Sequence, residues 1–599
     1  MPKIQAIPTG FTVMSKYFLD IASSVTGHAW LDALDLEGNE LAGRLQQQFG
    51  ASSTVARLLA AQGVTEPQFY SYLDPKLRDL LPNPKSFKDM ELALDCIIEA
   101  IEGKVKIAIY GDYDVDGACS AALMKLFLTH LGAECLIYIP QRLEEGYGLN
   151  NQAMQHLQQL GCGLVIAVDC GTNDGAAMQG ISGLKLVVLD HHKVAKLNEH
   201  AIAIVNPSRP DDNSGCAQLC AAGVVFITLV GLATRLRARY KIPDLLGYLD
   251  LVALATICDL VPLIGVNRAF VVGGLKIART LSNVGIKALA KAAMLVEPLN
   301  AYHFSYILGP SINAAGRIAD ASLGAQLLCC NSAQQAEEWA LSLRETNKQR
   351  QQLETEAQTS LIFALHNKYE GRELAPALIE MGDWHAGLVG LLAGRLKDKY
   401  LRPVIILSKK PDGTAVGSAR SIRGVDIGAL IAQAVEAGLL LRGGGHAMAA
   451  GLTIEQDKLE AFSTWLCQQI SEKIGQFHTQ PILKITSLIS ARGATEELCR
   501  EIEKAGPYGA GNMQPIFALR AHKIVYIKPM GSAHLTLTLQ DNSEAKLKAI
   551  AFNVIDGPLG QFLLNNLGNN IHIAGNLRLN SYRNFSSPQL NIIDAAPAF

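Results

Sequence analysis

A regularly spaced acidic stretch follows the apolar run Val105–Ile109. Asp112, Asp114 and Asp116 occupy alternate positions shortly after that run. In an extended chain, alternate side chains project to the same face, so the three carboxylates would lie close together. Like charges at such separations require a compensating cation. The spacing therefore predicts a metal site, although these residues alone are also compatible with an acidic turn that binds no ligand.

Two more apolar runs end in residues of metal-binding type. Val165–Val168 is followed by Asp169, and Leu186–Leu189 by Asp190, His191 and His192. Both runs read as short buried strands. In open parallel sheets, sites form beyond the carboxyl ends of the strands. Asp259 ends a predicted helix before a proline and is a further candidate, although by itself it would be read as a surface acid.

The segments that carry these residues resemble the DHH phosphoesterase superfamily. GDYDVDG, VDCG, LDHH and ICDLVPL occur in that order, and from about residue 40 onward the chain resembles the RecJ family of single-strand-specific exonucleases. The resemblance implies two divalent cations, Mn²⁺ or Mg²⁺. Oxygen ligands with one imidazole suit Mn²⁺ somewhat better. The implied metal ligands are Asp112, Asp114, Asp116, Asp169, His191 and Asp259.

The resemblance also implies catalytic roles for Asp169 and His192. Asp169 would be the carboxylate that bridges the two cations. His192 would hydrogen-bond or protonate a phosphate oxygen, and the alternative is a structural histidine beside the site. Many members of the superfamily carry a metal-binding His where this chain has Tyr110, so Asp112 or water is expected to complete the coordination of one cation.

Three downstream segments, LGPSINAAGR, GSARS and RGGGH, resemble the parts of the family that contact substrate. In LGPSINAAGR, Ser311 stands where relatives usually carry Arg, and a hydroxyl cannot replace bidentate phosphate contact by a guanidinium. The glycines of RGGGH, at a predicted helix start, would expose N–H groups to an anion. Without the resemblance, LGPSINAAGR and RGGGH could instead be turns that allow close packing. The implied substrate-binding residues are Asn313, Arg317, His385, Arg420, Ser421, Gly444 and His446.

The last 120 residues predict short strands separated by turns, which is typical of a small β-barrel. From residue 480 onward there are 11 Lys and Arg against 8 Asp and Glu. Tyr508, Tyr582, Arg583 and Phe585 are candidates for stacking on bases or for binding phosphate, as in barrels that bind single strands. The alternative is that the aromatic residues belong to the core or to strand edges.

Composition limits the class of protein. The formal net charge of −2 gives no general basic field, which argues mildly against a passive DNA-coating protein but not against a nuclease, whose acidic metal site contributes negative charge. The 12 cysteines show no zinc-type spacing and are expected to be reduced thiols in a cytoplasmic protein. No secretory signal and no apolar run of 18 residues is present, so we expect no membrane association.

Strands alternate with helices from residue 105 to about 210, which predicts a parallel sheet with right-handed crossovers. Ser332 and Gln335 form a capping box at the start of one predicted helix of up to about 35 residues. The expected fold class is α/β: a parallel-sheet DHH phosphoesterase domain, a long connecting helix, a second α/β DHH-associated domain and a C-terminal OB-like β-barrel. The expected boundaries are 1–104 for an N-terminal helical lead-in, 105–330 for the DHH domain, 331–370 for the connecting helix, 371–478 for the DHH-associated domain and 479–599 for the barrel.

The predicted function is metal-dependent 5′→3′ exonucleolytic degradation of single-stranded DNA to mononucleotides, in DNA repair and recombination. Polarity and DNA preference come from the resemblance alone. Single-stranded DNA is the expected partner, a single-strand-binding protein and a helicase are candidate partners, and a monomer is the simplest expectation. Two alternatives stay open: a phosphoesterase for oligoribonucleotides or cyclic dinucleotides, and a non-catalytic DNA-binding relative.

Overall fold

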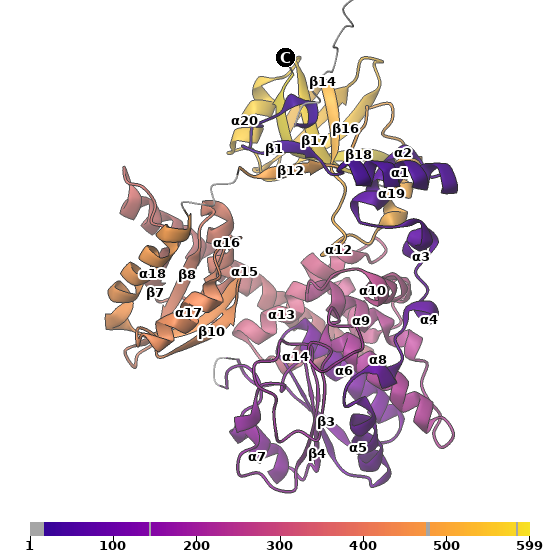
Figure 1. The fold of residues 1–599 in the computed structure, drawn as a ribbon, viewed down its shortest axis with the longest axis vertical. Coiled ribbons are helices and arrows are strands. Elements are labelled where there is room, and N and C mark those ends of the chain that lie inside the picture. The colour runs from indigo at the N-terminus through magenta and orange to yellow at the C-terminus, as the bar shows by residue number, and fades with distance from the viewer. Residues whose placement is uncertain (1–16, 143–144, 475–479, 583–584, 599) are drawn as a thin grey trace, which may run out of the picture. The chain divides into compact units, whose positions relative to one another are not determined.

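The computed structural model describes residues 17–142, 145–474, 480–582 and 585–598 (Figure 1). The chain divides into two compact units. One unit contains the α/β parts, Leu77–Pro262 and Val266–His478, and the other combines Met1–Lys76, Leu263–Gly265 and Thr479–Phe599. Among the described residues, no helix is long and apolar enough to cross a membrane.

The first sheet of the α/β unit has five parallel strands in the order β3-β2-β4-β5-β6. β2 and β4 are completely buried, as expected for apolar runs covered on both faces. Figure 1 shows α5 and α7 on opposite sides of this sheet. Gly111 at the end of β2 pairs with Val168 at the end of β4, which pairs with Leu189 at the end of β5. The predicted parallel sheet is confirmed. Its elements are α5 (Met90–Glu102), β2 (Ile107–Gly111), α6 (Val115–His130), β3 (Cys135–Tyr138), α7 (Asn151–Gln159), β4 (Leu164–Val168), β5 (Lys185–Leu189) and β6 (Ala203–Val205).

A group of helices follows the sheet in sequence, and α8 and α9 pack against α6. Asp259 is the residue directly after α9. The segment Leu308–Arg317 is helical rather than a turn, because α13 continues a π-helical turn at Phe304–Leu308. The bounds are α8 (Ala221–Leu236), α9 (Leu249–Cys258), α10 (Gly265–Ala278), α11 (Val284–Ala292), α12 (Ala301–His303), α13 (Gly309–Ile318) and α14 (Ser322–Leu328).

The predicted connecting helix is confirmed as α15, Ala333–Tyr369, whose 37 residues span about 55 Å at the usual rise. Ser332 caps it by accepting a hydrogen bond from the N–H of Gln335. Although much of its surface is polar and exposed, Asn347, Arg350 and Glu354 are buried. Arg350 donates to both of these neighbours, and Arg395 of α16 (Val389–Tyr400) also pairs with Glu354. This buried polar contact joins α15 to the lobe that follows it.

That lobe has a five-stranded sheet in the order β10-β11-β9-β8-β7, in which only β7 and β8 are parallel. The prediction of a helix start at the glycine run is wrong, because Arg442–His446 forms the edge strand β10. α17 lies so close that a Cβ at Gly443 would approach Ile431 Cγ2 to 2.5 Å. Glycine at position 443 therefore allows α17 to pack closely against β10. The bounds are β7 (Leu378–Gly382), β8 (Val404–Lys409), β9 (Thr414–Arg420), α17 (Ile427–Glu436), β11 (Ala449–Glu455) and α18 (Leu459–Ile474).

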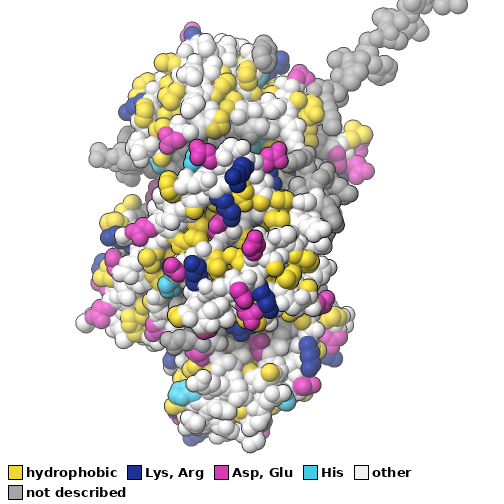
Figure 2. Space-filling view, turned by 90° about the vertical axis from the view of Figure 1, so that its left-hand side faces the viewer, with side chains coloured by type: hydrophobic (Ala, Val, Ile, Leu, Met, Phe, Trp, Pro, Cys, Tyr) yellow, Lys and Arg dark blue, Asp and Glu magenta, His cyan; other side chains and the backbone are white. Residues whose placement is uncertain are grey.

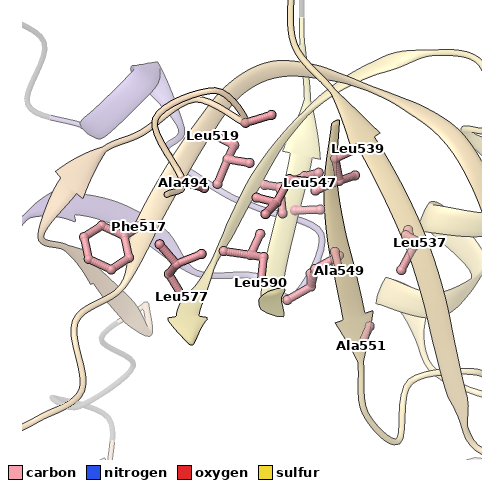
Figure 3. Packing of buried hydrophobic residues seen from close by; sticks show 14 of the residues in the cluster. Ala494, Phe517, Leu519, Leu537, Leu539, Leu547, Ala549, Ala551, Leu577 and Leu590 are labelled. Carbon is pink, nitrogen blue, oxygen red and sulfur yellow. The ribbon is translucent and has the colours of Figure 1, made fainter. Parts of the chain in front are cut away.

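The other compact unit contains the predicted barrel. Five strands close on themselves, because β14 pairs with both β15 and β17. Figure 3 shows core residues of this barrel, including Leu519, Leu547 and Leu590. Not all of the barrel strands are short, because β14 runs over 14 residues with two register shifts. The bounds are β12 (Ile482–Ile485), β13 (Ser487–Leu488), α19 (Glu496–Ala505), β14 (Phe517–Met530), β15 (His534–Gln540), β16 (Lys546–Ala551), α20 (Pro558–Asn565), β17 (Asn570–Tyr582) and β18 (Phe585–Pro597).

The N-terminal region is divided differently from the prediction. We expected 1–104 to be one helical lead-in, but the part up to Lys76 belongs to the barrel unit. There β1 (Ala29–Asp32) pairs in parallel with β12, and the indole N–H of buried Trp30 donates to Asp594 at 2.9 Å. The remaining bounds are α1 (Leu36–Phe49), α2 (Ser53–Ala61), α3 (Phe69–Leu73) and α4 (Leu77–Leu80). The 12 cysteines are all free.

Gly316 of α13 lies against the acidic stretch, where a Cβ would come within 2.3 Å of the carbonyl oxygen of Tyr113. At Gly394 of α16, nothing beyond the helix's own backbone lies within 4 Å of the place that an alanine methyl group would occupy. We expect Gly316→Ala to lower the free energy of unfolding by about 1–3 kcal/mol through overpacking. Gly394→Ala should raise it by about 0.4–1 kcal/mol through loss of unfolded-state entropy. Urea denaturation followed by circular dichroism measures both, and equal stabilities would contradict the tight packing of α13.

Candidate active site

The ends of three neighbouring strands bring the predicted metal ligands together. Asp112 follows β2, Asp169 follows β4 and His191 follows β5 after one intervening residue. Within the described residues, three groups have ligand atoms within 4.8 Å of one another, and they share Asp169 and His191. The groups are Asp169 with His191 and His192; Asp116 with His191 and Asp259; and Asp112 with Asp114 and Asp169. All six predicted ligands therefore belong to one cluster.

The local structure of the acidic stretch differs from the predicted extended chain. Asp114 is the N-cap of α6, and its side chain accepts hydrogen bonds from the N–H groups of Asp116 and Gly117 at 2.9 and 3.1 Å. Asp116 consequently lies in the first turn of α6. The prediction of three carboxylates on one face of a strand is wrong, because an Asp with free N–H groups after it starts a helix more readily than it extends a strand.

Asp116 points to the N-terminus of a second helix. Its two oxygens accept hydrogen bonds from the N–H groups of Ala221 and Ala222, at 2.7 and 2.8 Å, where α8 begins. The partial positive charge of that helix end favours the ionised carboxylate. Burial acts in the opposite direction and is the larger effect, so the pKa of Asp116 is raised. Helix contacts alone do not compensate this charge in the absence of a cation.

His191 is oriented as a metal ligand. Its Nδ1 lies 3.1 Å from the carbonyl oxygen of Leu219, which can only accept, so Nδ1 carries the hydrogen and Nε2 presents its lone pair. Nε2 lies 3.3 Å from Asp169, 3.7 Å from Asp259 and 3.8 Å from Asp116. The imidazole thus faces three carboxylates.

The donor set fits a hard divalent cation. One buried oxygen each of Asp112 and Asp169 has no hydrogen-bond partner in the described part of the chain. Burial and the neighbouring acids raise the pKa values of both groups well above the usual range. Unpartnered carboxylate oxygens with one imidazole form a ligand set suited to Mn²⁺, and to Mg²⁺ with water. A bound cation would compensate charges that the protein alone leaves unpaired.

His192 is held by a residue to which sequence analysis assigned no role. Its Nδ1 lies 2.8 Å from Asp190, which also accepts hydrogen bonds from the backbone N–H groups of His191 and Thr172. Burial opposes ionisation of Asp190, but its hydrogen bonds and the charge of His192 hold its pKa well below the usual range. Burial likewise opposes the charged imidazole, yet Asp190 raises the pKa of His192 to about 9. The position of Asp190 directly after a strand was the available signal.

Arginine side chains gather beside the acidic cluster, and one of them, Arg142, was missed. Its guanidinium carbon lies 4.8 Å from the ring centroid of Tyr113 within the acidic stretch. Burial and the neighbouring cations Arg142 and Arg350 lower the pKa of Arg317 to about 10, and burial and Arg142 also lower that of Arg420. No sequence motif for Arg142 stood out because the contact is through space. The three guanidinium groups therefore lie close to one another and to the acidic stretch.

Two of the predicted substrate-binding residues, Arg317 and His385, meet at Gly387. Arg317 donates to the carbonyl oxygen of Gly387 at 3.2 Å, and Nδ1 of His385 accepts from its N–H at 3.1 Å. Asn313 accepts from the N–H of Val115 and so holds the start of α6.

The other predicted contacts lie elsewhere. The buried hydroxyl of Ser421 donates to Val425, which makes this side chain part of a turn. Gly444 and His446 are exposed on β10. Their roles toward substrate stay predictions.

The two departures from the family pattern have structural explanations. Ser311 is fully buried, donates to the carbonyl oxygen of Ile307 at 2.7 Å and accepts from Arg344 of α15 at 3.2 Å. Position 311 therefore faces α15. This geometry does not support the expectation that Ser in place of Arg at this position removes a phosphate contact. Tyr110 is also fully buried, and its hydroxyl donates to the carbonyl oxygen of Gly148.

The barrel carries a row of outward-facing side chains in cross-strand register. Tyr526 pairs with Thr538, Thr538 with Lys548, Lys548 with Gln589 and Gln589 with Arg578. One aromatic ring and two cations therefore follow each other across five strands. The row differs from the residues that we predicted.

Of those predicted residues, the hydroxyl of Tyr508 donates to Ile502 and its ring packs against the core. Arg583 and the side chains of Tyr582 and Phe585 lie outside the described residues. On the face of the molecule in Figure 2, Lys and Arg are interspersed with Asp and Glu, as the net charge suggested.

Three family models match the chain. A DHH family N-terminal domain matches residues 106–256, a DHHA1 domain residues 375–472 and a RecJ OB domain residues 485–594. These matches coincide with the first sheet, the second sheet and the barrel. They agree with the fold class expected from sequence.

Similar proteins cover most of the chain. The single-stranded-DNA-specific exonuclease RecJ of Escherichia coli is 32% identical over 556 residues, which are 90% of this chain and 94% of that protein. RecJ of Bacillus subtilis is 31% identical, covering 92% of this chain and 69% of its own. The crystal structure of RecJ in complex with Mn²⁺ from Thermus thermophilus superposes with a TM-score of 0.76 at 26% identity, covering 94% of this chain and 78% of that one.

The acidic cluster predicts proton release on metal binding. Burial, together with the charges of Asp116 and Asp114, raises the pKa of Asp259 to about 8. An unfolded Asp has a pKa near 3.9, so between about pH 4 and pH 8 the folded metal-free protein binds more protons and loses stability as pH rises. A cation must displace these protons. We expect Mn²⁺ binding at pH 7 to release protons and to tighten between about pH 6 and pH 9.

Titration calorimetry in two buffers of different ionisation enthalpy measures this release. Asp259→Asn should reduce the number of protons released. Asp412→Asn changes an exposed acid in the turn between β8 and β9 and serves as the matched control. Mn²⁺ binding without proton release at pH 7 would show that the cluster is already ionised.

Proposed function

The chain belongs to the family of RecJ single-stranded-DNA-specific exonucleases, and on that premise we propose that it hydrolyses single-stranded DNA from the 5′ end and releases mononucleotides. The observation that carries this proposal is the single cluster of five carboxylates and one imidazole at the ends of β2, β4 and β5 and after α9. Such a ligand set serves phosphodiester hydrolysis in two-metal sites.

The cluster would hold two divalent cations, Mn²⁺ or Mg²⁺, which when bound supply Lewis acidity toward the phosphate and the attacking water. Asp169 would be a ligand to both cations, and this assignment is supported by its belonging to one group with His191 and to another with Asp112. The remaining ligands then divide into two sets, one around Asp112 and Asp114 and one around Asp116 and Asp259. This division fits two cations better than one.

The side chains around the cluster bind and orient the phosphate. His192 is fixed at Nδ1 by Asp190, and its Nε2 can donate a hydrogen bond to a phosphate oxygen when the ring is protonated. Arg142, Arg317 and Arg420 are placed to neutralise the negative charge of the strand next to the scissile bond. His192 is accordingly the catalytic histidine of the proposal.

The barrel row supports a single strand as substrate. Tyr526 is 47% exposed and offers a stacking surface, while Lys548 and Arg578 are exposed cations on the same face. Aromatic and basic side chains in succession are suited to the bases and phosphates of a flexible strand. A phosphoesterase for dinucleotides would have no use for this surface, and a non-catalytic relative would have no use for the intact ligand set.

We extend the proposal to a role in DNA repair and recombination, where a helicase and a single-strand-binding protein would supply and hold the single strand. The enzyme would act as a cytoplasmic monomer. The two protein partners fit the reaction, because it needs a free single-stranded end.

The exonuclease proposal is tested with a DNA oligonucleotide labelled at its 5′ or its 3′ end. We expect Mn²⁺ to promote immediate release of the 5′ label as a mononucleotide, and chelator to abolish it. Asp169→Asn should reduce the rate by at least about a hundredfold, because it removes a negative ligand from the site. Asp412→Asn is again the control outside the cluster.

Duplex DNA, RNA and a dinucleotide are compared in the same assay. Hydrolysis of the dinucleotide alone would move the assignment to a small-substrate phosphoesterase. DNA binding without hydrolysis of any substrate would identify a non-catalytic relative. Initial release of the 3′ label would reverse the proposed polarity.

The barrel row makes a separate prediction. Lys548→Ala combined with Arg578→Ala should weaken binding of a strand of about 20 nucleotides about tenfold and make its salt dependence shallower by roughly 1.4 in log–log slope, because two phosphate contacts are lost. Fluorescence anisotropy at several salt concentrations measures both quantities. An unchanged slope would show that the strand does not contact this face of the barrel.

A further inference from the structure

Tyr302 and Tyr306 form an exposed pair of aromatic rings outside the acidic cluster. Their ring centroids lie 5.0 Å apart and the ring planes differ by 30°, so the two rings stack on each other. Tyr302 is 61% exposed and Tyr306 is 68% exposed. Single apolar side chains are common on protein surfaces, but two stacked rings that stay open to solvent offer a surface that a flat ligand can extend.

The pair belongs to the helix that borders the active site. α12, the π-helical turn Phe304–Leu308 and α13 follow one another without a break. Tyr302 and Tyr306 are the only exposed residues between positions 301 and 318. Partly accessible residues follow at intervals of three or four positions and continue the same side of the helix. These residues are Pro310, Asn313 and Arg317.

Two close contacts hold this helix against the metal ligands. A Cβ on Gly309 would come within 2.4 Å of Sγ of Cys258, the residue directly before Asp259. A Cβ on Gly316 would come within 2.3 Å of the carbonyl oxygen of Tyr113 in the acidic stretch. The part of the helix between these two glycines therefore passes the acidic cluster.

The tyrosine pair and Arg317 lie at opposite ends of that part of the helix. Tyr306 comes three residues before Gly309, about 5 Å along the axis, and eleven residues before Arg317, about 16 Å. The order along the helix is thus the tyrosine pair, the acidic cluster and the arginine. A strand at the stacked spacing of about 3.4 Å covers the distance from Arg317 to Tyr306 in about five nucleotides.

We propose that Tyr302 and Tyr306 are a base-stacking platform for the single strand, on the far side of the scissile bond from Arg317. The inference rests on the proposed function, because it needs a strand in the active site with its terminal phosphate toward the arginines. It gives the catalytic unit a contact to the bases in addition to the barrel row. A pair that only stabilised its own helix, as neighbouring rings four residues apart can do, would be indifferent to the bases of a ligand.

Stacking on rings suits a single strand of any sequence. Every base has a flat face that an aromatic side chain can contact, so the contact does not depend on which base is present. In a duplex these faces are covered by the neighbouring base pairs, whereas a flexible single strand can turn a base toward the rings. The platform would hold the uncut part of the strand against the helix while the terminal nucleotide is released.

The test measures binding of a 5′-phosphorylated strand of about 20 nucleotides by fluorescence anisotropy, with chelator present so that no hydrolysis occurs. Tyr302→Ala combined with Tyr306→Ala in the full chain should raise Kd about five- to thirtyfold, the usual effect of losing a stacking ring. The salt dependence should keep its slope, because no phosphate contact is lost. Tyr302→Phe combined with Tyr306→Phe keeps both rings and should bind like wild type. Phe363→Ala removes a 67% exposed ring from α15 in the same compact unit and is the matched control.

The decisive measurement uses strands that lack one base at a time over about the first ten positions from the 5′ end. Wild type should lose affinity at one or two adjacent positions within about the first six nucleotides. At those positions the double alanine variant should lose nothing further, because the base that the rings contact is already absent. At the other positions the variant should be weakened as much as on the intact strand.

Equal weakening of the variant at every position would overturn the proposal, since no base would then depend on the rings. Wild-type affinity of the double alanine variant would also overturn it and would leave the pair to a protein partner. A shallower salt slope would contradict it by placing a phosphate at the rings.

Both rings are exposed, so the alanine variants are expected to fold, which circular dichroism checks. Failure of the proposed function is distinguishable, because it shows as an intact 5′ label after incubation of the wild-type protein with Mn²⁺, whatever the binding measurements give.

Discussion

The repulsion among five neighbouring carboxylates governs the geometry of this site: Asp112, Asp116 and Asp169 are buried, and Asp114 and Asp259 are half-buried. Their mutual repulsion and their loss of water are only partly offset by the protein, through the N-termini of α6 and α8. Unpartnered oxygens on Asp112 and Asp169 show where compensation is missing. The fold holds an excess of negative charge that divalent cations would neutralise. It can hold this excess because strands and helices fix the backbone of each carboxylate.

The elements around the cluster serve its geometry. Register between β2, β4 and β5 brings three strand ends side by side, and α9, packed on α6, ends at Asp259. α13 lies against the acidic stretch at Gly316, and its Ser311 meets Arg344 of α15. The buried pairing of Arg350 with Glu354, continued to Arg395, then joins α15 to the second sheet. A chain of packed and polar contacts thus connects the acids to the lobe that carries Arg420 and His385.

Positive charge in this protein is local rather than general. Burial and the nearby charge of Arg142 lower the pKa values of Arg317 and Arg420, and the barrel places Lys548 and Arg578 in register with an exposed tyrosine. A net charge of −2 is compatible with binding a polyanion because these cations are grouped where a strand would be held, while the acidic cluster is reserved for metal.

Sequence patterns alone predicted the strands of the first sheet, the long helix α15, the barrel and the six residues that meet in the acidic cluster. Buried parallel strands can be recognised in a sequence as short apolar runs, and the residues directly after them must meet at one edge of the sheet. Features that depend on contacts between distant residues became visible only in the tertiary structure. Asp116 lies in a helix because Asp114 caps it; Arg442–His446 is a strand because it pairs with β11; and β1 joins β12 across most of the length of the chain. Arg142 lies over the ring of Tyr113, a neighbour that no local pattern names, because ring contacts act through space rather than along the chain.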